Sequence, residues 1–387
     1  MSQYTHENYR KDKIRAIDAK FEAQKIAFAP LAFQAVRALL ELGILQSVSD
    51  SSAESATAVG STGEATGKQG ITIAEAAQKA GISPYGVKVL LEIALGMNIV
   101  KVLPGDGEDR FVLGKTGWFL LEDEMTRVNF DFVNDVCYKG AFELKRSVEA
   151  GKPLGLEVFG HEGKTIYEVL SSLPEQVKKS WFAFDHFYSD IGFEEALPIV
   201  FSKKPKKIID IGGNTAKWAL CCCRYDPQVE VLIVDLPGQT AVAEREAAKA
   251  GFSDRIKTMS CNILNDETAI PAGADIVWMS QFLDCFSLEE VIHILKKVGA
   301  AAGPATDVFI FEPFWDKQRF EAASYSLQAT SLYFTCMANG NSKMYNSGEF
   351  AQTVEKAGFY IAEAWHNVGS NEYSLLRCRI SNSESKT

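Results

Sequence analysis

The sequence predicts an α/β protein, in which a doubly wound, mostly parallel seven-stranded sheet follows an N-terminal all-α, winged-helix-like domain. Three observations support this fold class. Short apolar runs alternate with helical patterns from Lys206 to the C-terminus. The first run leads into an acidic residue and two glycines, a pattern typical of a strand that ends at a ligand. A helix-turn-helix pattern lies far upstream, between residues 71 and 102.

Length and charge narrow the class of protein. With 387 residues the chain is long for one domain and suits two. Hydrophobic residues make up 47% and charged residues 23%, as in soluble globular proteins. The net charge of −10 disfavours nucleic acid as the main partner, because phosphate binding needs a surplus of Lys and Arg on one face. A solvated lead-in to a strand explains the one local cluster of lysines: Lys203, Lys204, Lys206 and Lys207.

The cysteines and the N-terminus indicate the compartment. The eight cysteines include no CxxC pair and no Cys/His set with zinc-like spacing, so no metal site is expected. The N-terminus is polar and lacks an apolar signal core, and no apolar run is long enough to span a bilayer. We therefore expect a cytoplasmic protein with reduced thiols and no membrane partner.

The N-terminal domain is assigned to residues 1–130. Residues 16–45 are predicted to be helical, and their apolar positions are too dense for a simple amphipathic face. A helix that is apolar on nearly all sides is usually buried between other structural elements. These elements belong to a second subunit if the segment forms a dimer interface, and to the same chain if it is an ordinary core helix. Residues 49–70 are rich in Ser, Ala, Thr and Gly, so a flexible loop is expected there.

The helix-turn-helix pattern is expected to be structural. Thr72 can cap its first helix, Gly81 can end that helix, and Ser83 with Pro84 can begin the second. The following FVLGKTG could form the wing strand of a winged helix. A helix that reads DNA carries Arg, Lys, Asn or Gln toward the groove. The second helix offers Lys88 as its only basic residue, which disfavours DNA binding.

Residues 131–205 form a helical linker that contributes to the substrate pocket, and residues 206–387 form the ligand-binding domain. The linker is aromatic-rich around Trp181 and Phe182, which is consistent with core packing or with a pocket for a flat molecule. The later apolar runs lack the alternation of a one-sided sheet, so they are expected to be covered on both faces. The last two runs are close in sequence and are expected to pair as an antiparallel hairpin. The seven runs are KKIIDIGG, VEVLIVDLP, RIKTMSCN, ADIVWMSQF, DVFIFEPF, FYIAEAWHNV and YSLLRCRI.

The segment IIDIGGNTAKWAL carries the strongest signal for a ligand. A strand is expected to end at Asp210, Gly212 and Gly213 to form a turn, and a helix to begin near Thr215. Glycines let a backbone approach a ligand where a Cβ would clash. Asp235 lies at the end of the next strand, about twenty residues beyond the turn, where an acid can accept hydrogen bonds from ribose hydroxyls.

Charge favours S-adenosylmethionine over a dinucleotide as the cofactor. The turn does not match GxGxxG, and Asp210 would repel a pyrophosphate at the helix N-terminus. The same carboxylate would attract the ammonium and sulfonium of S-adenosylmethionine. A flavodoxin-like fold with a tight Gly-Gly turn and no nucleoside is the alternative.

These motifs make the chain resemble the plant-type O-methyltransferases, the group that includes caffeic acid and hydroxyindole O-methyltransferases. The resemblance rests on IIDIGG, the VDLP after the second strand, FIFEP and a late SGEFAQTVEKAGF, in that order, after the winged-helix-like region. It implies a homodimer, with interlocked N-terminal helices, that methylates a small molecule.

The resemblance also implies which residues hold the cofactor. Asp210, Gly212 and Gly213 would lie along its methionine portion, while Asp235 and Leu236 would hold the ribose and adenine. Three further places are expected at the cofactor. Asn214 stands where the family has glycine, and Asn262 and Ile263 replace part of a GDMF-like segment. Ser280 stands at the position of a family Lys, next to Gln281.

The catalytic position departs from the family. Asp284 stands where the family has its catalytic His, and Glu312 and Glu349 match the two acids that flank that His. A phenol has a pKa of roughly 10, whereas Asp at about 3.9 is a weak base unless burial raises its pKa. His186 is therefore a second candidate base, and Tyr188 and Asp190 are further ones.

Substrate contacts are also carried over from the family. Phe182, His186, Met337 and Asn339 fall where the family lines its acceptor pocket. The resulting hypothesis is methyl transfer from S-adenosylmethionine to an oxygen of a small aromatic or phenolic acceptor, with an atypical base. The alternatives are N- or C-methylation, a cofactor-binding homologue that has lost catalysis, and a transcription factor that uses the helix-turn-helix.

Overall fold

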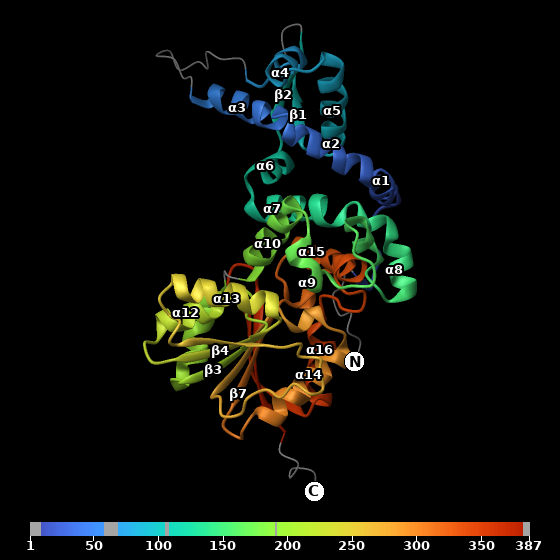
Figure 1. Cartoon of the computed structure of the whole chain (residues 1–387). Helices are drawn as coiled ribbons and strands as arrows, with labels where there is room; N and C mark the ends of the chain where they lie inside the picture. Colours follow the sequence, from blue (N-terminus) through green and yellow to red (C-terminus); the bar gives the residue numbers. More distant parts are fainter. Residues whose placement is uncertain (1–8, 58–68, 105–107, 190–191, 382–387) are drawn as a thin grey trace. The chain divides into compact units, whose positions relative to one another are not determined.

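The computed structural model describes residues 9–57, 69–104, 108–189 and 192–381 (Figure 1). The chain forms two compact units that meet in sequence between Phe130 and Asp131. The segment 131–205, which the sequence suggested as a linker, packs in the same unit as the sheet. Each unit is described separately.

The N-terminal unit begins with three helices where one was predicted. They are α1 (Ala16–Ala27), α2 (Ala29–Glu41) and α3 (Ile44–Thr57). The breaks have local causes, because Pro30 favours the first turn of a new helix and Gly43 adopts a positive φ of 65°. The prediction of a flexible loop at 49–70 is wrong for its first part, because α3 continues to Thr57. Residues 58–68 of the predicted loop lie outside the described residues.

The predicted helix-turn-helix and its wing strand are confirmed. Helix α4 (Ile73–Ala80) is capped reciprocally by Thr72 and Glu75 and ends at Gly81, which has a positive φ of 67°. Helix α5 (Pro84–Gly96) follows the cap Ser83. Strands β1 (Val100–Leu103) and β2 (Arg110–Leu113) then pair antiparallel. Helices α6 (Lys115–Glu122) and α7 (Glu124–Phe132) complete this region.

The second unit begins with the helical segment that the aromatic-rich sequence predicted. Its α-helices are α8 (Leu144–Ala150), α9 (Ile166–Val169), α10 (Glu175–Ser189) and α11 (Phe193–Val200). Shorter turns of π- and 3₁₀-helix separate them: η2 (Val133–Cys137), η3 (Gly140–Glu143), η4 (Leu154–Phe159), η5 (Leu170–Ser172) and η7 (Phe201–Lys203).

All seven predicted strands are confirmed and form one sheet in the order β5-β4-β3-β6-β7-β9-β8. The first five strands pair parallel, and β8 and β9 form the predicted antiparallel hairpin at one edge. The strands are β3 (Lys207–Ile211), β4 (Glu230–Asp235), β5 (Ile256–Ser260), β6 (Ile276–Ser280), β7 (Asp307–Glu312), β8 (Phe359–Val368) and β9 (Tyr373–Ile380).

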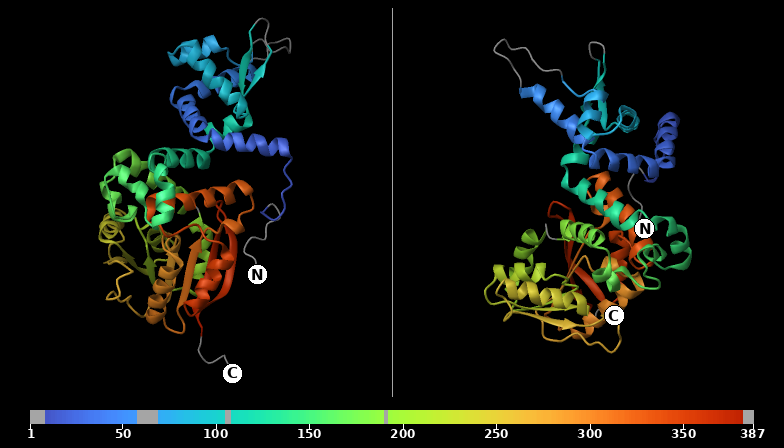
Figure 2. Two further views of the ribbon diagram at one scale, coloured as in Figure 1. Left: turned by 90° about the vertical axis from the view of Figure 1, so that its right-hand side faces the viewer. Right: turned by 45° about the horizontal axis from the view of Figure 1, so that its top comes forward.

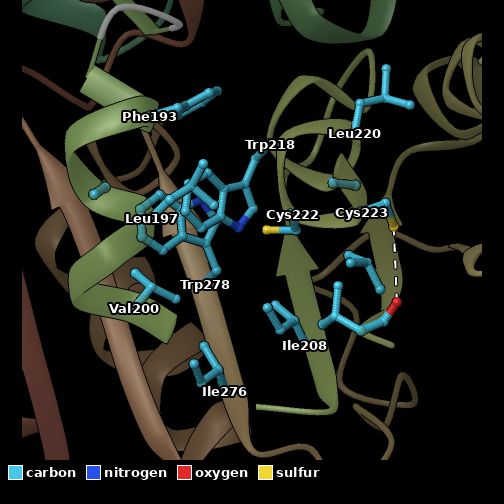
Figure 3. Close-up of a cluster of buried hydrophobic side chains, with 14 of the residues drawn as sticks. Phe193, Leu197, Val200, Ile208, Trp218, Leu220, Cys222, Cys223, Ile276 and Trp278 are labelled. Atoms are coloured by element: carbon cyan, nitrogen blue, oxygen red, sulfur yellow. Dashed lines mark hydrogen bonds between the residues drawn. The ribbon is translucent and has the colours of Figure 1, made fainter. Parts of the chain in front are cut away.

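Helices cover both faces of the sheet, as the unbroken apolar runs required (Figure 1, Figure 2). One face packs against α11, α12 (Lys217–Tyr225) and α13 (Pro237–Lys249). The core on that face contains Trp218 stacked on Trp278, with ring centroids 3.8 Å apart (Figure 3). The other face packs against α14 (Leu288–Ala301) and α16 (Ser347–Lys356).

The segments after β6 and β7 bring further residues to the carboxyl end of the sheet. They include η8 (Leu283–Cys285), η9 (Trp315–Lys317), α15 (Glu321–Tyr333) and η10 (Phe334–Ala338). Within the described ranges no single helix is both long and apolar enough to cross a bilayer, although Ala29–Glu41 and Ile44–Ser52 pass that test as a pair bent by 64°.

Candidate active site

The turn after β3 is built for close contact. Gly212 has a positive φ of 77°, and a Cβ there would lie 2.2 Å from the ring of Phe282. A Cβ on Gly213 would lie 2.6 Å from Oδ2 of Asp210. Asn214 also adopts a positive φ, of 44°, a region that Asn tolerates better than most residues. The turn therefore requires small residues at both glycine positions, and α12 begins at Lys217, two residues later than the sequence suggested.

Two carboxylates stand at the ends of adjacent strands. Asp210 is buried, and its Oδ2 has no hydrogen-bond partner among the described residues. Burial and then the charge of Asp235 raise the pKa of Asp210 to about 8. Burial also raises the pKa of Asp235 to about 6, although the backbone N–H groups of Asn214 and Leu236 lower it. An acidic pair of this kind stabilises a positively charged ligand nearby.

A cavity of about 350 Å³ opens beside this turn, within the second unit. It runs from the ends of β3, β4 and β6 to the helical segment that precedes the sheet. Its described lining is Phe132, Thr165, Tyr167, Glu168, Leu170, Trp181, Phe184, Asp185, Gly212, Asn214, Val234, Asp235, Leu236, Gln239, Cys261, Asn262, Ile263, Leu264, Gln281, Phe282, Asp284, Cys285, Phe286, Glu290, Tyr333, Phe334, Asn339, Asn341 and Met344.

Most residues expected at a cofactor line one end of this cavity. They are Gly212, Asn214, Asp235, Leu236, Asn262, Ile263 and Gln281. Asp210, Gly213 and Ser280 are not part of the lining, and Oδ2 of Asp210 instead lies against Gly213 of the turn. Oδ1 of Asn262 accepts the N–H of Leu264 at 3.0 Å, which leaves one lone pair of that oxygen for a ligand.

Asp284 also lines the cavity, on the short turn η8 after β6. Its side chain is 4% exposed. Burial raises its pKa to about 7, the Cys285 thiol that donates to Oδ1 lowers it, and the charge of Asp185 raises it. Burial therefore brings Asp284 into the range where a carboxylate can act as a general base at neutral pH.

Glu312 fixes the turn that carries Asp284. Its Oε1 accepts the N–H groups of Phe282 at 3.0 Å and Leu283 at 2.8 Å. It is buried behind the turn and is not part of the cavity lining. Burial, and then the charge of Asp284, raise its pKa well above the ordinary value. Its contacts therefore position the turn.

Helix α10 presents a different face to the cavity than expected. Trp181, Phe184 and Asp185 line it, whereas Phe182 and His186 do not. Residues four apart share a helix face, and the rings of Phe182 and His186 accordingly stack with centroids 5.9 Å apart on another side of α10. Phe182 packs against the helical core. Tyr188 is buried, and Asp190 lies outside the described residues.

Three other expected site residues have structural contacts. Met337 is 1% exposed, packs against Gly140 and Gly155, and does not line the cavity, contrary to the expectation for it. Asn339 does line it, but its side chain bridges the carbonyl of Cys285 and the N–H and hydroxyl of Ser342. Glu349 lies in the first turn of α16, pairs with Lys343 at 2.9 Å and does not line the cavity.

The cavity lining also contains residues that sequence reasoning did not select. Asp185 accepts a hydrogen bond from Nδ2 of Asn214 at 3.1 Å, so it connects the glycine turn to α10. The indole N–H of Trp181 donates to the hydroxyl of Tyr333 at 2.7 Å. The rings of Phe132 and Phe184 stack at 3.9 Å. Trp181 and Phe184 belong to the aromatic cluster visible in the sequence, but nothing there connects it to Phe132 or Tyr333.

The fold and this cavity define a class of protein: doubly wound α/β enzymes that bind a nucleoside cofactor at the carboxyl ends of their strands. Within the described residues, no group of His, Cys, Asp and Glu could hold a metal ion. A sequence profile of the O-methyltransferase domain family matches residues 125–360. The chain therefore belongs to this family of S-adenosylmethionine-dependent methyltransferases.

Individual relatives are distant. The L-tyrosine C(3)-methyltransferase of Streptomyces lavendulae is 23% identical over 336 residues, which cover 86% of this chain and 85% of that protein. The solved structure of the S-adenosylmethionine-dependent methyltransferase SibL matches with a TM-score of 0.66 at 20% identity, over 92% of this chain and 98% of that one. The O-methyltransferase NcsB1, in complex with S-adenosylmethionine and 2-hydroxy-5-methyl naphthoic acid, matches with a TM-score of 0.59 at 19% identity, over 90% and 95% of the two chains.

Proposed function

We propose that the chain transfers the methyl group of S-adenosylmethionine to an oxygen of a small aromatic acceptor, with Asp284 as the general base. One observation carries this proposal. A single cavity connects a nucleoside-type end, at Asp235 and Leu236, to an aromatic end that contains Trp181 and the buried Asp284. A methyl donor and an acceptor can therefore meet within one cavity, where orientation lowers the barrier.

The residues of the cofactor end fit S-adenosylmethionine. The carboxylate of Asp235 can accept hydrogen bonds from ribose hydroxyls while the N–H of Asn214 holds it in place. Asn262 and Ile263 line the place expected for the adenine. The buried Asp210 would stabilise positive charge near the turn in its ionised form, which a nearby cation favours, and its Oδ2 has no partner among the described residues. When bound, the cofactor supplies a sulfonium methyl group that is intrinsically electrophilic.

Asp284 suits the role of base because it lines the cavity and its pKa is about 7. In the proposed step the acceptor O–H bond breaks, its proton passes to the Asp284 carboxylate, and the oxygen electron pair forms the new O–CH₃ bond. The S–CH₃ bond breaks and its electrons stay on sulfur, which becomes a neutral thioether. His186 is the weaker candidate, because it does not line the cavity.

Methyl transfer to a panel of phenols, aromatic amines and aromatic carbon acids tests the proposal. We expect Asp284→Asn to lower kcat by about 10²- to 10⁴-fold, the range for loss of a general base. His186→Ala serves as the matched control and should change kcat by less than about 3-fold. Equal kcat values for Asp284→Asn and the wild type would exclude Asp284 as the base. Cofactor binding without transfer to any compound would indicate a homologue that has lost catalysis.

Carbon methylation is a second candidate. It is favoured by the Streptomyces relative that matches 86% of this chain, because that relative's name describes methylation at C(3) of L-tyrosine. Removing a phenolic proton would also activate an adjacent ring carbon, so Asp284 could serve both reactions. NMR of the methylated product separates them, since an O-methyl group and a ring C-methyl group have different carbon shifts.

We also propose that the protein is a homodimer that associates through its N-terminal helices. Apolar side chains on α1, on α2 and at the residue between them are 48% to 75% exposed: Ile17, Phe21, Ile26, Phe28 and Leu31. Helix α1 buries none of its residues within the chain. An apolar surface of this kind is typical of an interface. A cytoplasmic location stays a prediction, supported by eight cysteines that form no disulfide in the described structure.

A further inference from the structure

Tyr167 carries a buried hydroxyl that the protein itself does not satisfy. Its oxygen is shielded from solvent and has no hydrogen-bond partner in the part of the chain that the structure describes. The same residue lines the cavity. A buried hydroxyl without a partner is destabilising, and nearly all buried polar groups in proteins have one. The place of this hydroxyl therefore indicates a partner that enters the cavity.

The ring of Tyr167 has a defined position. Helix α9, which carries it, begins where Oε2 of Glu168 accepts the N–H of Thr165 at 2.7 Å. The ring packs against the helical core that contains Trp181 and Tyr333. Tyr333 also lines the cavity, but its hydroxyl accepts the indole N–H of Trp181 at 2.7 Å. Of the two tyrosines in the described lining, Tyr167 is thus the one whose hydroxyl has no partner.

Tyr167 is a neighbour of the proposed base. Cys285 interacts with Tyr167, while its thiol donates to Oδ1 of Asp284 at 3.5 Å. A thiol is only a weak acceptor, so Cys285 leaves the hydroxyl available to a better one. Burial, and then the charges of Cys285 and Tyr333, raise the pKa of Tyr167 well above its ordinary value, and the charge of Asp284 raises it further. The hydroxyl therefore keeps its proton at neutral pH and can donate a hydrogen bond.

From this arrangement we infer that Tyr167 donates a hydrogen bond to a second oxygen of the acceptor, close to the hydroxyl that Asp284 deprotonates. The inference rests on the proposed function, in which Asp284 is the base. A carboxylate can only accept, so Asp284 cannot satisfy an ether or carbonyl oxygen, whereas Tyr167 can. Because both residues adjoin Cys285, the second oxygen belongs ortho or meta to the reacting hydroxyl. Tyr167 would thus select among aromatic acceptors.

Three pairs of phenols provide the test, and each pair compares a methoxy group with an ethyl group of similar shape. The group is ortho in 2-methoxyphenol and 2-ethylphenol, and meta in 3-methoxyphenol and 3-ethylphenol. It is para in 4-methoxyphenol and 4-ethylphenol, which serve as the internal control because the group lies across the ring from the hydroxyl. Calorimetry measures each affinity for the enzyme saturated with S-adenosylhomocysteine. In the ortho or the meta pair, we expect the methoxy compound to bind about 5- to 30-fold more tightly, since ethyl leaves the buried donor unpaired.

Variants assign the preference to a residue. Tyr167→Phe removes the hydroxyl and keeps the ring. It should reduce the methoxy preference by about 5-fold or more and leave the affinity for S-adenosylhomocysteine within about 3-fold. Tyr325→Phe is the matched control, because Tyr325 is 72% exposed on α15 and does not line the cavity. It should leave the preference unchanged.

The outcomes separate the two proposals. The same methoxy preference in Tyr167→Phe and the wild type, a preference confined to the para pair, or no binding of any phenol to an enzyme that binds S-adenosylhomocysteine would overturn the inference. A parallel loss of affinity for S-adenosylhomocysteine and for the phenols in Tyr167→Phe would overturn it too, because the hydroxyl would then support the cavity as a whole. Failure to bind S-adenosylmethionine at all would instead refute the proposed function.

Discussion

The backbone N–H of Asn214 donates a hydrogen bond to Oδ2 of Asp235 at 2.9 Å. This bond joins the turn after β3 to the carboxyl end of β4. The two strands pair in parallel register, with Ile211 opposite Val234, so both ends reach the same edge of the sheet. Local backbone geometry thus brings Asn214 and Asp235 together at this edge of the sheet.

The carboxylate of Asp235 should contribute directly to cofactor affinity. Asp235→Asn keeps the shape of the side chain but removes its charge and one acceptor oxygen. We expect the Kd for S-adenosylmethionine to rise by about 10- to 100-fold. Fluorescence or calorimetric titration measures this change, and a melting curve checks that the variant is folded. An unchanged Kd in a folded variant would show that the ribose is held elsewhere.

The tight turn should not tolerate a side chain at Gly213. A Cβ there would lie 2.6 Å from Oδ2 of Asp210 and 2.9 Å from Cγ2 of Ile233. Gly213→Ala should therefore displace the turn and weaken cofactor binding by about 10-fold or more, because overpacking typically costs about 1–3 kcal/mol.

Gly238→Ala supplies the control for this experiment. Gly238 lies in the first turn of α13, and no atom lies within 4 Å of a Cβ built there. Alanine favours a helix over glycine by about 0.5–1 kcal/mol, so this variant should keep its cofactor affinity and melt slightly higher. Equal cofactor affinity of the Gly213→Ala and wild-type proteins would contradict the geometry of the turn.

Ligand-free protein should lose stability as pH rises, through the buried Asp210. Its pKa is about 8 in the folded state and about 3.8 in the unfolded state. Between these values the folded state binds more protons, so this group stabilises the fold at low pH, and that contribution is lost as pH rises through about 8. Asp210→Asn stays neutral at every pH.

Urea denaturation of the wild type and Asp210→Asn at pH 5 and pH 8 measures this effect. The free energy of unfolding of Asp210→Asn minus that of the wild type should be larger at pH 8 than at pH 5. A pH-independent difference, or a difference of opposite sign, would show that Asp210 is not protonated in the ligand-free protein.

The rate of methyl transfer should depend on the protonation of Asp284. Its pKa of about 7 predicts that kcat/KM rises with pH through this value, because the base must be unprotonated to accept the proton. The residual rate of Asp284→Asn should lack that rise. A pH–rate profile of the wild type and the variant with one acceptor provides the measurement. The same rise in both proteins would assign it to another group.

Substitutions on the N-terminal helices should alter the oligomeric state. Ile26 and Leu31 are 75% and 69% exposed, and replacing both with Glu would place charges in the proposed dimer interface. We expect light scattering to show a dimer for the wild type and a monomer for the double variant. Tyr85→Glu, at an apolar residue of α5 that is 78% exposed, should remain dimeric. A wild type that is monomeric at all concentrations would refute the interface.

The sheet could be predicted because its strands are covered on both faces. Runs such as IVWM in β6 and VFIF in β7 are apolar throughout, which distinguishes them from one-sided strands and from amphipathic helices. The N-terminal helices were harder, since dense apolar sequence conceals where one helix ends. The bends after Ala27 and near Gly43 depend on single residues within that run.

The two ends of the cavity differed in how well they could be predicted. Asp235 ends β4, Leu236 follows it, and Asn262 comes two residues after β5, so the strand pattern alone places them at the edge of the sheet. The face of α10 that lines the cavity is set by packing against distant segments, such as Phe132 and Tyr333. No local pattern shows that Asp185, rather than its neighbour His186, lines the cavity.

Direct titration of the purified protein with S-adenosylmethionine tests the central claim most simply. The acidic glycine turn and the carboxylate of Asp235 predict saturable binding of one cofactor per chain, and weaker binding by Asp235→Asn. They also predict that NAD, whose pyrophosphate would meet the acidic turn, does not compete. An absence of binding by S-adenosylmethionine and S-adenosylhomocysteine, or displacement of either by NAD, would contradict the account.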